Sequence, residues 1–302
     1  MKSMSVTAQQ EWLTRAERSN RAAIKFIVWV AQRLGRPMAR LLLYPICVYF
    51  VLFCPAATAS SRKFLAKVLH RPPGFSDVFR HYYFFAAILL DRVFLLGNQS
   101  HIFDIEIHGE DVVANAFASG QGCFMVGAHL GSFEVVRTIG RRKPGLGVRL
   151  VMYEANARKI NSVLSAINPT LSSGIIGLGN FDSMLKVEES LGRGEFVCLL
   201  ADRSLEEDSL LRCPFLGELA PFPLGPFRVA ALLKRPVILM FGIYRGGSRY
   251  DVHFETLIDF TNVERAQRGR MVEEAARRYV VRLEHYVRAA PYNWLNFYDF
   301  WK

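Results

Sequence analysis

His129 and Glu134 are the residues whose types and spacing first suggest chemistry. His129 follows the apolar run CFMVGA at residues 123–128, and Glu134 comes five residues later, after a turn that contains Gly131 and Ser132. A carboxylate that accepts a hydrogen bond from one imidazole nitrogen fixes the tautomer, and the other nitrogen can then remove a proton from a hydroxyl. The spacing indicates the histidine–carboxylate half of a triad, with a substrate hydroxyl in place of the serine.

The context of the pair matters because the bare spacing is common. His101 and Glu106 have the same offset, within HIFDIEIH at residues 101–108. Alternation of polar and apolar residues predicts a strand there, and an odd offset in a strand puts two side chains on opposite faces. His129 and Glu134 instead span a glycine-containing turn. The alternative interpretation of His129 is a structural histidine with satisfied hydrogen bonds.

A second polar site follows another apolar run. FVCLLAD, residues 196–202, ends in Asp202, and a loop rich in glycine and proline then leads toward a predicted helix at 224–233. Ligands and reactive groups gather at the carboxyl ends of strands in parallel α/β domains. The sequence therefore predicts a site at such strand ends, with a helix-capping loop as the alternative interpretation of the second segment.

The elements that would position these residues alternate between strand and helix. Further strands are predicted at 148–153, 174–178, 196–201, 237–244 and 250–257, and further helices at 110–118, 155–167, 181–191 and 263–288. This alternation predicts an α/β fold with a mixed, largely parallel sheet flanked by helices. The last helix carries one apolar stripe and i,i+4 ion pairs, as a solvated helix covering a sheet does.

Composition narrows the classes of protein that the chain can be. It has 302 residues, a formal charge of +11, 51% hydrophobic residues and 22% charged residues, which excludes a disordered chain and argues against a polytopic membrane protein. A basic and apolar chain suggests an anionic membrane surface. The basic residues are scattered without a nucleic-acid motif, which argues against a nucleic-acid binder. Five cysteines without CxxC spacing favour a reducing compartment over disulfides or a zinc site.

The N-terminal region contains the most apolar segment. Residues 41–57 carry no charge, and the basic stretch before them is too long for a secretory signal peptide. Pro45 is expected to kink this helix and Pro55 to end it. Three interpretations stay open: a helix that spans or inserts deeply, amphipathic helices lying in the interface, and a buried helix. We predict a helical membrane-associating region over 1–97 and an α/β domain over 98–302.

Four sequence blocks, in order over residues 120–302, resemble the lipid A late acyltransferase family, a branch of the lysophospholipid acyltransferase superfamily. GAHLGSFE resembles its histidine-X4-acid block, and LLADRS its Asp-Gln-Asp block. PFLGELAPFPLGPFRVAALLKRPVI resembles a stretch that runs from F-G through T-P-x-G into a helix. The C-terminal PYNWLNFYDFWK resembles the family's ending. The resemblance implies a fold like that of glycerol-3-phosphate acyltransferases.

The resemblance also implies an activity. Such enzymes move a fatty acyl group from an acyl carrier protein or coenzyme A thioester to a hydroxyl of a membrane lipid, at the cytoplasmic face of the bacterial inner membrane. His129 would be the general base and Glu134 its orienting partner, with no covalent acyl-enzyme, metal or cofactor. The basic charge suits an acidic carrier protein, coenzyme A phosphates or anionic lipid.

Substrate-binding residues are carried over in the same way. The expected set is Gly131, Arg158, Asp202, Arg203, Gly217 and Gly225. Arg203 stands where the family has Gln and Ser132-Phe133 where it has Asn-Trp, so the sequence predicts a divergent branch and leaves the acceptor open. The alternatives are a thioesterase or lipid hydrolase with the same histidine, and a non-catalytic lipid-binding membrane protein.

Overall fold

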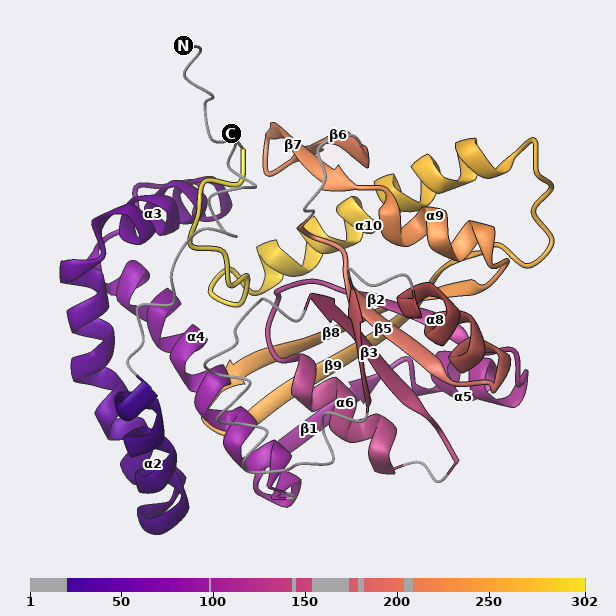
Figure 1. The fold of residues 1–302 in the computed structure, drawn as a ribbon. Coiled ribbons are helices and arrows are strands. Elements are labelled where there is room, and N and C mark those ends of the chain that lie inside the picture. Colours follow the sequence, from indigo (N-terminus) through magenta and orange to yellow (C-terminus); the bar gives the residue numbers. More distant parts are fainter. Residues whose placement is uncertain are drawn as a thin grey trace.

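The computed structural model describes residues 21–97, 99–142, 145–153, 174–178, 182–203 and 209–301 (Figure 1). The strands are β1 (Asp104–His108), β2 (Cys123–Gly127), β3 (Val148–Tyr153), β4 (Ile175–Leu178), β5 (Phe196–Leu200), β6 (Leu210–Phe215), β7 (Glu218–Pro223), β8 (Pro236–Gly246) and β9 (Arg249–Asp259). The helices are α2 (Arg21–Phe53), α3 (Pro55–Leu69), α4 (Phe75–Leu96), α5 (Glu110–Ala118), α6 (Phe133–Arg142), α8 (Asp182–Gly192), α9 (Gly225–Leu232) and α10 (Arg268–Ala289).

One seven-stranded sheet organises the molecule, in the order β1-β9-β8-β2-β5-β3-β4. Its neighbouring strands run parallel, except that β8 and β9 form an antiparallel pair. The predicted fold class, a mixed and largely parallel sheet flanked by helices with an apolar N-terminal helix, is confirmed. The predicted helix at 155–167 lies outside the described residues.

Helices cover both faces of the sheet because its central strands are apolar on both sides. In β2, Phe124 and Val126 belong to one hydrophobic cluster, which includes residues of α9 and α10. Cys123 and Met125 belong to the other cluster, which includes residues of α4 and α6. Alternate residues of a strand point to opposite faces, so a continuous apolar run can serve both layers. Figure 1 shows α6 and α10 on opposite sides of the strands.

The segment between β5 and α9 differs from its prediction. The sequence predicts a loop there, whereas β6 and β7 form a separate antiparallel hairpin, with Arg212 opposite Pro221 and Pro214 opposite Leu219. Proline cannot donate a ladder hydrogen bond and is tolerated in strands at sheet edges. A two-stranded hairpin consists of edge strands, which is why a proline-rich sequence can form it.

The N-terminal helices are longer than the sequence predicts. Helix α2 contains the apolar segment as far as Phe53 and has non-helical dihedral angles at Gly35 (φ 83, ψ 173). Pro45 lies inside this helix, and Pro55 opens α3. The helix has a kink at Gly35, where the positive φ suits glycine. The kink expected at Pro45 stays a prediction. Residues Ile24–Phe53 are long and apolar enough to cross a membrane by length and composition. The boundary at residues 97 and 98 stays a prediction.

Candidate active site

The turn that carries His129 is held against strand β8. Gly131 has a φ of 68, and a Cβ built on it would lie 1.9 Å from the carbonyl oxygen of Gly242. The backbone N–H of Ser132 donates to the same oxygen at 2.7 Å. Only glycine allows this backbone conformation and this approach without strain. The predicted role of Gly131 in binding substrate stays a prediction, but its role in fixing the turn follows from these contacts.

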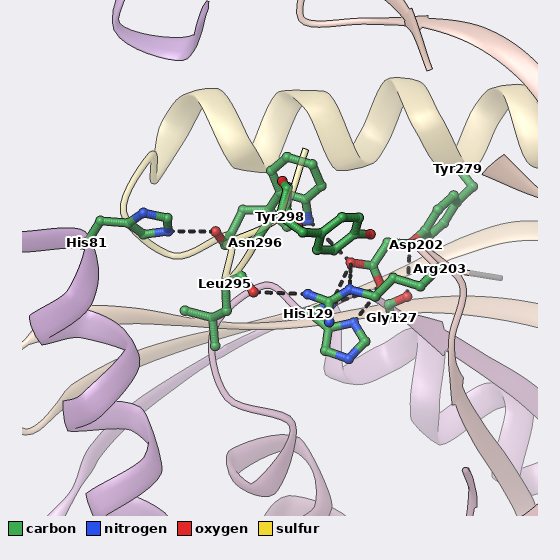
Figure 2. A network of polar contacts seen from close by, with 10 residues as sticks. His81, Gly127, His129, Asp202, Arg203, Tyr279, Leu295, Asn296 and Tyr298 are labelled. Atoms are coloured by element: carbon green, nitrogen blue, oxygen red, sulfur yellow. Dashed lines mark hydrogen bonds and ion pairs between the residues drawn. The ribbon is translucent and has the colours of Figure 1, made fainter. Parts of the chain in front are cut away.

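Asp202 provides the carboxylate that His129 contacts (Figure 2). Strands β2 and β5 are parallel neighbours, with Gly127 opposite Leu200, so residues two positions beyond each strand meet at one edge of the sheet. Nδ1 of His129 lies 2.8 Å from Oδ1 of Asp202, and the backbone N–H of His129 donates to both carboxylate oxygens at 3.2 Å. A carboxylate accepts hydrogen bonds, so Nδ1 carries the proton and Nε2 keeps its lone pair.

Two further side chains fix the buried Asp202 carboxylate. The indole Nε1 of Trp294 donates to Oδ2 at 3.3 Å, and Nε of Arg203 lies 4.0 Å from the same oxygen. Arg203 is itself held, since one Nη donates to the carbonyl oxygen of Leu295 at 2.9 Å and the guanidinium lies over the ring of Tyr298. Figure 2 shows the Arg203 side chain running past both Asp202 and His129. The site is therefore pre-organised by residues that directly follow β5 and by the C-terminal segment.

The local charges set the protonation states that a general base needs. Burial raises the pKa of the Asp202 carboxyl, but His129 and Arg203 favour the carboxylate more strongly and hold that pKa at about 2. Burial lowers the pKa of His129, and the charge of Arg203 lowers it further, against the opposing effect of Asp202. The His129 side chain is 35% exposed. At neutral pH it is a neutral, accessible imidazole beside a fixed carboxylate.

Glu134 has other partners among the described contacts. It lies in the first turn of α6, where its side chain is 4% exposed, with Oε1 3.2 Å from an Nη of Arg92 and Oε2 4.0 Å from one of Arg137. The orienting hydrogen bond that the sequence assigns to Glu134 is made by Asp202, because β5 brings that carboxylate to Nδ1. A direct contribution of Glu134 to the reaction stays a prediction.

The remaining predicted site residues are more dispersed. Gly217 lies at the turn between β6 and β7 with a φ of 86, and Gly225 begins α9. The hairpin reaches the site through Phe215, whose ring packs on that of Trp294 at a centroid distance of 5.2 Å. Substrate binding by either glycine stays a prediction. Arg158 lies outside the described residues.

Sequence reasoning missed the structural role of the C-terminal segment. Leu130 and Trp294 form an isolated antiparallel bridge, and the backbone N–H of Leu295 donates to the carbonyl oxygen of His129 at 2.7 Å. The side chain of Asn293 bonds both the N–H and the carbonyl of Tyr244 in β8, at 2.7 and 3.0 Å. The sequence showed only that the C-terminal segment PYNWLNFYDFWK is rich in aromatic and amide residues and resembles a block of the family. Neither feature predicts which residues the segment contacts.

The fold and this site define an α/β protein with a hydrogen-bonded histidine–carboxylate pair at the ends of parallel strands. The chain matches the family described as bacterial lipid A biosynthesis acyltransferase over residues 91–302, and it belongs to that family. No curated protein matches it. Among solved structures it is similar to the 1-acyl-sn-glycerophosphate acyltransferase PlsC from Thermotoga maritima, at 16% identity and a TM-score of 0.37, covering 81% of this chain and 95% of that one.

Proposed function

We propose that this protein is a membrane-associated O-acyltransferase. It moves a fatty acyl group from an acyl carrier protein or coenzyme A thioester to a hydroxyl of a membrane lipid or glycolipid. The observation that carries the proposal is the hydrogen bond of 2.8 Å between Nδ1 of His129 and the buried Asp202. It leaves Nε2, on a side chain that is 35% exposed, with the lone pair that a base needs. Membership in an acyltransferase family supports it.

The proposed reaction uses His129 twice. Its Nε2 takes the proton of the acceptor hydroxyl while that oxygen attacks the thioester carbonyl carbon. The tetrahedral intermediate then breaks its C–S bond, and the imidazolium returns the proton to the departing thiolate. Asp202 stays ionised and stabilises the imidazolium between the two steps, as the aspartate does in a serine hydrolase triad. Because the thioester is already activated, transfer proceeds directly, without an acyl-enzyme and without a resident cofactor.

Helix α2 is the proposed membrane contact. Two of its arginines face the protein, while Lys25 and Arg33 are exposed. Arg36 forms two bonds to Asp91, at 2.7 and 2.9 Å, and Arg40 bonds the hydroxyl of Tyr244. The exposed surface of α2 is mostly apolar, and its large apolar side chains are Phe26, Trp29, Leu34, Met38, Leu41, Tyr44, Val48, Tyr49, Leu52 and Phe53. A helix with this division is typical of one that lies in the membrane interface.

This arrangement favours the interfacial interpretation over a spanning helix. A spanning α2 would lead away from the α/β domain, whereas one side of it packs on α4, which itself contacts α6 and β8. Arg36 of α2 also holds Asp91 of α4. We infer that α2 inserts its exposed face into the cytoplasmic leaflet of the bacterial inner membrane. The net charge of +11 adds attraction to anionic lipid and to an acidic carrier protein.

Acyl transfer is tested with the purified full-length chain and with total bacterial lipid as acceptor. The donor is a radiolabelled acyl thioester, either of an acyl carrier protein or of coenzyme A. His129→Ala should abolish label transfer, and His101→Ala, at an exposed histidine, should retain it. Full activity in His129→Ala would refute the mechanism. Thioester consumption that is independent of acceptor would favour a hydrolase, and co-purified lipid without turnover a binding protein.

Membrane association is tested by flotation with phosphatidylglycerol vesicles. Leu41→Asp and Leu52→Asp place charges on the exposed face of α2, where the wild-type residues are 59% and 60% exposed. Both should reduce vesicle binding. Val281→Asp on α10, at a residue 66% exposed, is the matched control and should bind normally. Equal losses in all three variants would contradict a specific role for α2.

A further inference from the structure

A cluster of metal-binding side chains lies on the outer edge of the sheet, away from the candidate active site. Edge strand β1 pairs in parallel with β9, so that Glu106 lies opposite Asp251 and His108 opposite His253. Residues two apart on a strand point to the same face. The pairs Glu106–Asp251 and His108–His253 therefore place two carboxylates and two imidazoles on one face of the sheet, at the edge formed by β1 and β9.

The side chains of this cluster are close enough to share one ion. Ligand atoms of His108, Asp251 and His253 all lie within 4.8 Å of one another. The two imidazole rings stack at a centroid distance of 4.5 Å and an interplanar angle of 10°. Nε2 of His108 is also 3.4 Å from a carboxylate oxygen of Glu106, which puts a fourth candidate ligand beside the three.

His253 carries a second and independent indication. Its Nε2 is buried and has no hydrogen-bond partner among the described residues. Buried polar atoms of side chains are nearly always paired, so such an atom calls for an explanation. Its ring packs against that of Tyr286 in α10 at 4.8 Å, an apolar contact that supplies no hydrogen bond to the nitrogen. Coordination of a metal ion by Nε2 of His253 would give this nitrogen a partner through its lone pair.

Asp251 keeps coordinating capacity despite an ion pair. Nε of Arg245 contacts its Oδ2 at 2.5 Å, and a carboxylate has a second oxygen with its own lone pairs. A ligating carboxylate is commonly held in place by an outer hydrogen bond of this kind. Arg245 thus acts as the residue that orients Asp251, in the same way that carboxylates orient ligating histidines.

We propose that His108, Asp251 and His253 bind a divalent transition-metal ion of the zinc class. Two imidazoles and a carboxylate are a donor set that zinc accepts, with Zn–N distances of about 2.0–2.1 Å. Closing the three ligand atoms around an ion requires the stacked rings to turn apart, and His108 can move because its side chain is 43% exposed. The ion would link edge strand β1 to β9 and stabilise the end of the sheet.

The experiment uses the full-length chain in detergent, without a polyhistidine tag, after treatment with EDTA and dialysis. Calorimetric titration with zinc chloride should show one site per chain. His108→Gln, His253→Gln and Asp251→Asn should each weaken zinc binding roughly tenfold or more, since even the loss of an outer-shell partner costs 10–100-fold. His101→Gln, an exposed histidine elsewhere on the surface, is the matched control and should bind zinc as the wild type does.

Thermal unfolding provides the second readout. Zinc should raise the unfolding temperature of the EDTA-treated wild type and of His101→Gln, but not that of the three ligand variants. His108 is exposed, so His108→Gln keeps the test valid if His253→Gln folds poorly. Absence of one-site zinc binding in the wild type, or unchanged affinity in His108→Gln and Asp251→Asn, would overturn the proposal. Acyl transfer by His108→Gln should equal that of the wild type, which separates this site from the reaction at His129.

Discussion

Asp202→Asn tests the arrangement of the candidate active site most directly. The amide keeps the size of the carboxylate. Its oxygen takes the Oδ2 position, where the backbone N–H of His129, 3.2 Å away, and the indole N–H of Trp294 both donate. Its NH₂ group, however, donates where the carboxylate accepted, at the 2.8 Å contact with Nδ1. Nδ1 must then be the acceptor, and the proton moves to Nε2. The imidazole loses the lone pair that would take the proton of the hydroxyl.

The expected loss is large because the wrong tautomer cannot act as a base. The equivalent change in a serine protease triad lowers kcat about 10⁴-fold with the geometry intact, and we expect a loss of about 10³–10⁴ here, or about 4–5.5 kcal/mol in the barrier. The assay is steady-state transfer of radiolabelled acyl groups, corrected for the folded fraction by circular dichroism. Asp111→Asn, at an exposed aspartate in α5, is the control and should be fully active.

The pH profile gives the same test a second readout. The base works in its neutral form, so kcat/KM of the wild type should rise with pH through the His129 pKa. Burial and Arg203 lower that pKa, so the midpoint should lie below the ordinary value of about 6.5. Asp202 opposes this shift, so Asp202→Asn should move the midpoint of its residual activity to still lower pH. Activity of Asp202→Asn within about tenfold of the wild type would refute the reasoning.

The remaining predictions concern the residues around this pair. Trp294→Phe removes the hydrogen bond to Asp202 and should cost about 1–3 kcal/mol of stability in thermal unfolding, together with a lower kcat; an unchanged kcat would contradict the orienting role. Arg36→Met leaves the buried carboxylate of Asp91 without its cation and should lower the free energy of unfolding, measured in urea, by about 3 kcal/mol. Almost no loss would show that the pair is solvated and would contradict this prediction. Glu134→Gln leaves two neighbouring arginines underpaired and should cost about 1–3 kcal/mol in the same measurement. Its kcat should fall less than that of Asp202→Asn, and the opposite ranking would return the orienting role to Glu134.

Local sequence patterns predicted much of the fold. The apolar runs around residues 123–128 and 196–201 became β2 and β5, because a strand buried on both faces must be apolar throughout. An apolar run of this kind lies within a single strand, so the residues of that strand are enough to recognise it. The hairpin of β6 and β7 was missed because its prolines are unfavourable in most strands, and its pairing depends on its place outside the main sheet.

The site required information that no local pattern contains. The sequence placed His129 and Asp202 each just beyond an apolar run, but it offered Glu134, five residues away, as the nearest carboxylate. Strand order decides which acid reaches the imidazole, and β5 lies beside β2 although the two residues are 73 apart in the chain. The hydrogen bond from Trp294 to Asp202 likewise joins residues far apart in the chain, so no local pattern predicts it.

The sequence by itself determined the class of fold, the two polar residues at strand ends and the apolar N-terminal helix. These follow from periodicity and from residue types, which are properties of short segments. The tertiary structure alone decided that Asp202 orients His129, that Arg36 and Arg40 of α2 turn inward, and that His108 meets His253 across β1 and β9. Each of these depends on packing and register between distant segments, because hydrogen bonds and ion pairs form between atoms that only the folded chain brings within reach.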